Sequence, residues 1–361
     1  MPIDPKNRGV QSPQLAELDF IAGQETGIQY EEVNAAGDWT LSLPKRETQF
    51  INTFDTQACV TFSALNIIEM QLNYFLASGK LSPDKVKKLT DWGFIEDGKF
   101  NFSDRFTAKM SGTTPQGNSL QKVWDSIRKD GLLPELMWKS QGALNWADYY
   151  KEIPQQIKDY AKNILTIFEF KYEWVVTGNC AAPNLELLKY HLKQAPLQPA
   201  HPLCARDSQG VFQPCNVCVT QHATSIYNII STVKDFDHYY PYENEYALNY
   251  TFPWVMKAVV LLKKDEIEQP PFSYTFTQDI LIEQRSTEVL MLQKALNVLG
   301  YKIPILPDAM NRGYYGQITR AAVKDFQYKY SVANLIVLKW NNGRFVYGQT
   351  RAKLNLLLNG I

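Results

Sequence analysis

Residues 49–76, QFINTFDTQACVTFSALNIIEMQLNYFL, decide what the rest of the chain is expected to be. Cys59 lies where a turn gives way to a helix. Apolar residues follow it at the helical spacing of three to four positions, at Phe62, Leu65, Ile68, Leu72 and Phe75. Ser78 and Gly79 end this pattern. The sequence therefore predicts a buried helix with Cys59 in its first turn, where unpaired N–H groups and the helix dipole favour a thiolate.

A cysteine in such a place can also be a small hydrophobic core residue. The segment CVTFSALNIIE, however, resembles the catalytic-cysteine helix of the papain-like cysteine peptidases. The matching positions are Cys59, Phe62, Ser63, Ala64 and Glu69, whereas Val60 and Thr61 depart from the family pattern. The resemblance implies an α+β fold, with a helical half and an antiparallel β-barrel-like half, in which Cys59 is the nucleophile.

Two further segments resemble the same family. His222-Ala223, followed by a β-branched and aromatic run, is similar to the strand that carries the family's catalytic histidine. A buried core histidine is the alternative for His222. The third residue of the triad, which orients the imidazole, is assigned to Asp237, with Asp235 as the alternative. The resemblance implies a Cys-His-Asp thiolate mechanism with no cofactor and no catalytic metal.

The substrate-facing residues are less well marked. The family places an oxyanion glutamine six residues before the cysteine, but Thr53 stands there, so Gln49 or Gln57 is expected to supply the amide. Gly112 and Gly117 are expected beside the substrate backbone, and ordinary turn glycines are the alternative.

Four more cysteines lie in the segment that leads up to His222: Cys180, Cys204, Cys215 and Cys218. Free thiols, one or two disulfides and a metal site all remain open, because only Cys215 and Cys218 have the C-x-x-C spacing of zinc modules.

Composition limits the function classes. The 361 residues favour two domains, and 37 basic against 37 acidic residues give no net field to attract nucleic acid or anionic membranes. No apolar run is long enough to span a bilayer, and the start of the chain does not resemble a Sec signal peptide. We therefore expect a protein made in the cytoplasm that acts at the cell envelope or in a virion by another exit route.

The C-terminal segment resembles the peptidoglycan-binding domain of bacterial and phage cell-wall hydrolases. Its anchors are Leu292, Gln293, Leu296, Leu299, Gly300, Tyr301, Gly316, Thr319, Ala322, Val323, Phe326, Gln327 and Thr350. The resemblance implies a small all-α domain that binds peptidoglycan, and an unrelated helical domain is the alternative. Tyr314, Tyr315 and Arg320 are the expected glycan contacts.

The expected organisation is an N-terminal arm at 1–38, a peptidase domain at 39–265, a linker at 266–284 and the peptidoglycan-binding-like domain at 285–361. The leading hypothesis is a papain-like cysteine peptidase held at a bacterial wall, as in a phage lysin. The alternatives are a virion-maturation or host-processing protease with a docking domain, and a non-catalytic wall-binding protein on a degenerate peptidase scaffold.

Overall fold

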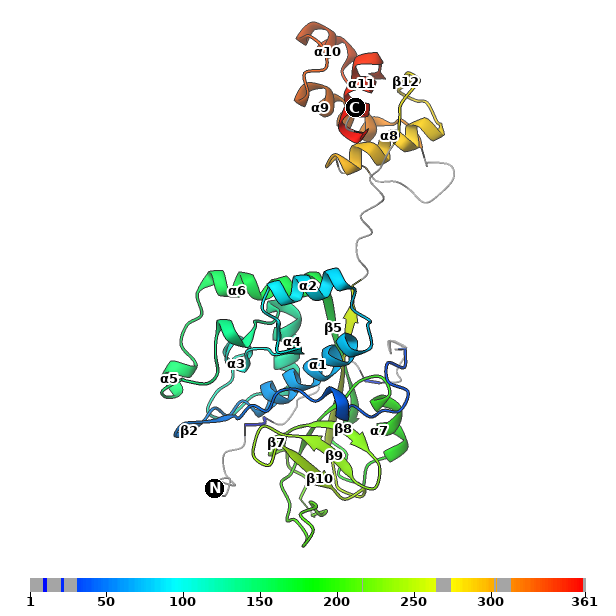
Figure 1. Ribbon diagram of the computed structural model, residues 1–361. Coiled ribbons are helices and arrows are strands. Elements are labelled where there is room, and N and C mark those ends of the chain that lie inside the picture. The colour runs from blue at the N-terminus through cyan, green and yellow to red at the C-terminus, as the bar shows by residue number, and fades with distance from the viewer. Residues whose placement is uncertain are drawn as a thin grey trace. The chain divides into compact units, whose positions relative to one another are not determined.

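The computed structural model describes residues 9–11, 21–22, 31–215, 217–263, 274–301, 303 and 313–359. The chain divides into two compact units, Met1–Lys263 and Lys264–Ile361 (Figure 1). Much of the predicted linker and most of the predicted N-terminal arm lie outside the described residues, so the bounds of the four predicted segments stay a prediction.

The first unit is built around α1 (Cys59–Ala77), which buries 16 of its 19 residues. This confirms the predicted helix with Cys59 in its first turn, and Cys59 is the first residue of that turn. Shorter helices gather on one side of α1 (Figure 1). They are α2 (Pro83–Asp91), α3 (Asp104–Met110), α4 (Leu120–Asp130), α5 (Trp146–Tyr149) and α6 (Gln155–Ala161), with 3-10 turns η2 (Glu135–Met137) and η3 (Lys162–Thr166). A further 3-10 turn, η1 (Thr40–Ser42), follows Trp39, whose N–H donates to the carbonyl of Tyr227 at 3.0 Å.

An antiparallel seven-stranded sheet forms the other half. Its order is β10-β9-β8-β6-β11-β5, and β7 also pairs with β6. The strands are β5 (Phe168–Thr177), β6 (Leu197–His201), β7 (His222–Ala223), β8 (Ser225–Ile229), β9 (Val233–Phe236), β10 (Glu243–Tyr246) and β11 (Trp254–Leu262), with helix α7 (Leu185–Leu192) between β5 and β6. The path ends at β10 and β5 without closing, so the predicted barrel-like half is an open sheet. Two small hairpins, β1 (Phe50–Ile51) with β2 (Phe54–Asp55) and β3 (Ile95–Glu96) with β4 (Lys99–Phe100), lie outside it.

Two buried glutamines join α1 to this sheet. Gln71 donates from Nε2 to the Ala258 carbonyl at 3.0 Å and accepts from the Val260 N–H at 3.0 Å. Gln198 donates from Nε2 to Ser63 Oγ at 2.6 Å and to the carbonyl of Val60 at 2.9 Å. Hydrogen bonds made in a dry interior are directional and costly to break, so they fix the position of α1 along the sheet. The first turn of the helix, with Cys59, is thereby held against the strands.

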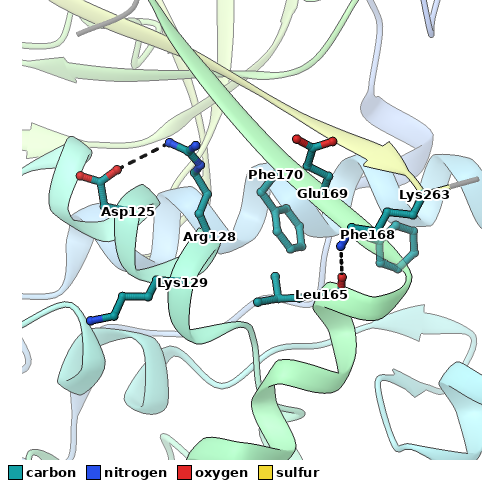
Figure 2. Close-up of a pocket in the computed structure, with 8 residues that line it drawn as sticks. All are labelled: Asp125, Arg128, Lys129, Leu165, Phe168, Glu169, Phe170 and Lys263. Atoms are coloured by element: carbon teal, nitrogen blue, oxygen red, sulfur yellow. Dashed lines mark hydrogen bonds and ion pairs between the residues drawn. The ribbon is translucent and has the colours of Figure 1, made fainter. Parts of the chain in front are cut away.

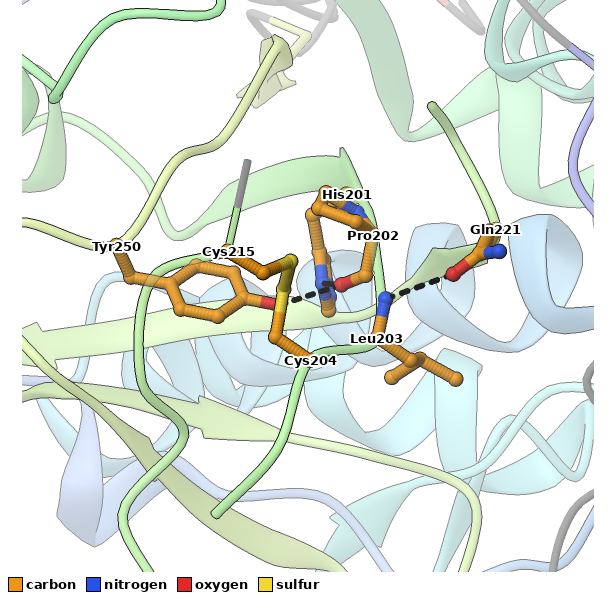
Figure 3. Close-up of a disulfide and its surroundings, with 7 residues drawn as sticks. All are labelled: His201, Pro202, Leu203, Cys204, Cys215, Gln221 and Tyr250. Carbon is orange, nitrogen blue, oxygen red and sulfur yellow. Dashed lines mark hydrogen bonds between the residues drawn. A yellow bond between two sulfur atoms is a disulfide. The ribbon is translucent and has the colours of Figure 1, made fainter. Parts of the chain in front are cut away.

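The four remaining cysteines form two disulfides, Cys180–Cys218 and Cys204–Cys215. Of the alternatives that the sequence left open, the structure selects this pairing. Figure 3 shows the second disulfide beside Tyr250, whose hydroxyl donates to the carbonyl of Pro202.

Within its described residues, the second unit has four helices and one short strand pair. The helices are α8 (Thr287–Val298), α9 (Gln317–Lys329), α10 (Leu335–Asn341) and α11 (Gly348–Asn359), and the strands are β12 (Ile280–Leu281) and β13 (Phe345–Val346). The strand pair is an addition to the predicted all-α domain. Gln293 donates to Thr319 at 3.0 Å, and Gln327 repeats this contact with Thr350 at 3.1 Å, so each helix is tied to the start of a later one.

None of the helices in the described ranges combines the length and hydrophobicity that a membrane crossing requires.

Candidate active site

Cys59 begins α1 and is fully buried, and it is not part of a disulfide. The preceding residue, Ala58, is the N-cap and accepts the first-turn N–H groups of Thr61 and Phe62 at 2.8 and 3.0 Å. The sulfur therefore lies at the positive end of a 19-residue helix, a position that stabilises a negative charge.

His222 and Asp237 meet next to this sulfur. Nε2 of His222 lies 2.9 Å from Oδ1 of Asp237. A ring nitrogen of His222 and the Cys59 sulfur lie within 4.8 Å of each other, and the two side chains are hydrogen-bonded. Because Nε2 faces the carboxylate, Nδ1 is the nitrogen left to face the sulfur. The three residues that the sequence selected are thus brought together.

His222 and Asp237 each stabilise the charged form of the other. Burial by itself lowers the pKa of the His222 imidazole, but Asp237 and Cys59 outweigh burial and hold that pKa well above its usual value. Burial by itself raises the pKa of Asp237, but His222 outweighs it, and the pKa of the carboxyl lies well below its usual range. The arrangement favours an imidazolium between two negative groups.

Asp237 is held in place from both sides. The His238 N–H donates to Oδ1 at 2.7 Å, and Asn244 Nδ2 donates to Oδ2 at 3.1 Å. The alternative, Asp235, is buried in β9, and burial with the neighbouring Asp237 raises its pKa to about 7. Of the two carboxylates, Asp237 is the one that hydrogen-bonds His222.

Asp55 organises the loop before α1, a role that the sequence did not reveal. Its Oδ1 accepts from Gln49 Nε2 at 2.6 Å and from the backbone N–H of Gln57 at 2.7 Å, and its Oδ2 accepts from the Tyr239 hydroxyl. Gln57 has a left-handed φ of 55°. An aspartate two residues before a positive-φ turn is the only local signal, and it is common in loops.

Part of the N-terminal arm crosses the site. The Asn118 N–H donates to the Gly9 carbonyl at 3.0 Å, and the Gln11 N–H donates to the Asn118 carbonyl at 2.8 Å. A Cβ placed on Gly9 would lie 3.0 Å from the Cys59 sulfur, and one placed on Gly117 would lie 2.0 Å from the Gly9 carbonyl carbon. Gly117 therefore lies against the backbone of the chain's own arm at Gly9. Its expected position beside a substrate backbone stays a prediction. By contrast, a Cβ on Gly112 would meet nothing within 4 Å.

His238 is a second histidine at the site, next to His222. It is 1% exposed, and its ring lies 4.9 Å from the His222 ring and 5.3 Å from the Phe62 ring. Neither of its ring nitrogens has a hydrogen-bond partner among the described residues. Burial lowers the pKa of this imidazole to about 3, so the ring is neutral at pH 7.

A separate surface pocket of about 430 Å³ lies between α4, β5 and the end of β11 (Figure 2). It is lined by Asp125, Arg128, Lys129, Leu165, Phe168, Glu169, Phe170 and Lys263. None of the candidate catalytic residues lines it, so it is not the site of the Cys59 chemistry.

In the second unit, the three expected glycan contacts differ in exposure. Tyr314 is 38% exposed and carries the Arg285 guanidinium over its ring at 5.3 Å. Arg320 donates from Nε to the Asn342 carbonyl at 3.1 Å. Tyr315 is fully buried and donates its hydroxyl to the Gly343 carbonyl at 2.8 Å. The prediction for Tyr315 is therefore wrong, because its ring belongs to the core of this unit.

Solved structures similar to this chain include cysteine proteases and their precursors. Digestive procathepsin L 3 of Tenebrio molitor larval midgut is 13% identical over 70% of this chain and 76% of its own, with a TM-score of 0.43. Xylellain, a cysteine protease from Xylella fastidiosa, is 14% identical over 73% and 99%, with a TM-score of 0.44. Procathepsin B S9 from Trypanosoma congolense is 11% identical over 72% and 86%, with a TM-score of 0.42.

No curated protein matches the chain significantly. A family model does match its C-terminal part, in agreement with the resemblance seen in the sequence: residues 285–333 match the "Putative peptidoglycan binding domain".

Proposed function

We propose that this protein is a papain-like cysteine peptidase that its C-terminal unit holds at a bacterial cell wall. The observation that carries the proposal is the 2.9 Å contact between His222 and Asp237 beside the Cys59 sulfur. These residues come from three separate segments of the chain, and the family resemblance assigns these roles to Cys59, His222 and, with Asp235 as the alternative, Asp237.

In the proposed reaction, the Cys59 thiolate attacks a peptide carbonyl and forms an acyl-enzyme. The His222 imidazolium gives its proton to the leaving amine and then takes one from the water that hydrolyses the thioester. Asp237 accepts the hydrogen bond from Nε2, which keeps the proton-transferring Nδ1 directed at the sulfur.

The oxyanion is assigned to the Cys59 backbone N–H together with one glutamine amide. Gln49 Nε2 uses one of its two hydrogens on Asp55, which leaves a second hydrogen for the oxyanion. Gln57, two residues before Cys59, is the alternative donor. A substrate needs the space beside Gly117 and Cys59, so the arm at Gly9 must move away before cleavage.

The wall-directed part of the proposal rests on the family match over residues 285–333. A wall peptide or an envelope protein is the proposed substrate class, and a phage lysin-like role is one form of it. Tyr314 and Arg320 remain the proposed glycan contacts.

The test is alkylation of the full-length protein with iodoacetamide or an epoxide probe at about pH 5–6, where an ordinary thiol is unreactive. Peptide mapping should show selective labelling of Cys59 that falls in a His222→Ala variant. Labelling of Cys59 no faster than that of a free cysteine peptide would contradict the proposal. Sedimentation of the full-length protein with purified cell-wall sacculi tests the binding part separately.

A further inference from the structure

Three buried side chains converge at the start of α1. One ligand atom from each of Cys59, His222 and His238 lies within 4.8 Å of the others, and the residues are 0%, 2% and 1% exposed. A tetrahedral zinc ion with bonds of about 2.0–2.3 Å sets its ligand atoms about 3.3–3.6 Å apart. Side-chain movements that shorten these separations by about 1 Å would therefore let the three atoms bind one cation.

His238 is the residue that makes this triangle more than a thiol–imidazole pair. The proposed peptidase reaction needs one histidine, and His222 supplies it. His238 is nevertheless enclosed in the protein with neither ring nitrogen hydrogen-bonded among the described residues. A buried, unsatisfied polar group costs about 1–3 kcal/mol, so its presence calls for an explanation.

We propose that Cys59, His222 and His238 form a binding site for a thiophilic divalent cation, with Zn²⁺ as the fitting ion. One sulfur and two imidazole nitrogens are the ligands that zinc prefers, and three protein ligands leave a fourth position for water. Mg²⁺ and Ca²⁺ prefer oxygen ligands, which this triangle does not offer.

The surroundings of the triangle already have the form of a metal site. Nε2 of His222 is hydrogen-bonded to Asp237, which directs Nδ1 toward the cation. Carboxylates that orient a ligating imidazole in this way raise its basicity and its affinity for the metal. The Asp237 carboxylate is in turn fixed by the His238 N–H and by Asn244.

The consequence for activity rests on the proposed peptidase function. Zinc would occupy the thiolate sulfur and the Nδ1 of His222, and the proton of the ion pair would go to solvent. Neither group could then take part in acyl transfer, so the cation would act as a reversible inhibitor. Removal of zinc by a chelator would restore the dyad.

The experiment uses the full-length protein without added reductant, in which the two disulfides stay formed. Co²⁺ is titrated first, because a cobalt–thiolate bond gives a near-ultraviolet charge-transfer band, and Zn²⁺ affinity is then measured by competition with a chromophoric chelator. We expect one equivalent of Co²⁺ with the thiolate band. His238→Gln should weaken zinc binding by at least about 100-fold, because loss of a mere outer-shell partner already costs about 10- to 100-fold.

Three further variants make the result specific. Cys59→Ser should abolish the thiolate band, whereas His191→Gln, which removes a histidine on α7, should change neither band nor affinity. His238→Asn serves as a second variant if His238→Gln has a lowered thermal transition. Zinc should also protect Cys59 from iodoacetamide in the wild type and not in the His238 variants.

The outcomes separate this inference from the proposed function. Wild-type zinc affinity in both folded His238 variants, or the absence of a thiolate band, would overturn the metal site even if Cys59 is labelled and peptides are cleaved. A His238-dependent thiolate band in a protein that fails the labelling test would support the metal site and remove the peptidase proposal.

Discussion

Nε2 of His222 lies 2.9 Å from Oδ1 of Asp237, although the two residues are 15 positions apart and Asp237 follows the strand β9. This contact selects the orientation of the imidazole relative to Cys59. It also makes the role of the carboxylate testable by substitution.

Asp237→Ala should slow the alkylation of Cys59 at about pH 6 and lower peptidase kcat by about 100-fold, within the range of general acid–base effects. Asp237→Asn should retain more activity, because its amide oxygen can still accept from His222 Nε2. For each variant, timed alkylation assays measure the labelling rate of Cys59, and steady-state kinetics measure kcat. Equal loss in the two variants would show that the charge, and not the orientation, is what His222 needs.

Gly9→Val should activate the protein. Gly9 has a φ of 74°, and a Cβ there would meet the Gln57 carbonyl oxygen at 2.8 Å and the Cys59 sulfur at 3.0 Å, so the arm should leave the site. The alkylation rate of Cys59 should rise. Gly79→Val is the matched control, because its φ is 70° and a Cβ there would meet nothing within 4 Å. An unchanged rate in Gly9→Val would mean that the arm does not limit access.

Gln49→Ala should lower kcat by about 100- to 1,000-fold, the usual cost of losing an oxyanion donor, with little effect on the alkylation rate of Cys59. Gln57→Ala is the companion variant. If Gln57→Ala shows the loss in kcat and Gln49→Ala does not, the oxyanion donor is Gln57.

Stability should decrease between pH 7 and pH 9. Burial and the neighbouring Glu47 raise the pKa of Glu135 to about 8, and burial also raises the pKa values of Glu69 and Asp104. The folded protein holds protons that the unfolded chain has already lost, so this stabilisation disappears as the pH rises through about 8.

For Glu135 alone the loss between pH 7 and pH 9 is about 1.4 kcal/mol, equivalent to one pKa unit. Urea unfolding at the two pH values measures it. Glu135→Gln should flatten the dependence, because an amide is uncharged and does not titrate at either pH. A pH-independent free energy of unfolding in the wild type would contradict the prediction.

The two disulfides should stabilise the first unit to different degrees. Cys180–Cys218 spans 38 positions and Cys204–Cys215 spans 11, so the entropy lost by the unfolded chain corresponds to about 4 and about 3 kcal/mol. The double variants Cys180→Ser with Cys218→Ser, and Cys204→Ser with Cys215→Ser, test each bridge by denaturant unfolding. A larger loss from the shorter loop would contradict this order.

The sequence alone determined the elements whose cause is local. The apolar spacing after Cys59 places the thiol in the first turn of a buried helix, and the structure has that helix at Cys59–Ala77. The anchors Gln293 and Thr319 likewise marked the second unit, in which they hydrogen-bond at 3.0 Å. Helical periodicity and turn chemistry depend on neighbours within a few residues, so they can be recognised in the chain itself.

The tertiary structure decided what depends on distant segments. Asp235 and Asp237 are two positions apart and point the same way along an extended chain, so only the position of His222 separates them. The burial of Tyr315, the three contacts of Asp55 and the approach of Gly9 to Cys59 depend in the same way on packing between parts of the chain. His238 joins the Cys59 site for that reason as well: long-range packing sets which side chains share a site, and no local pattern encodes it.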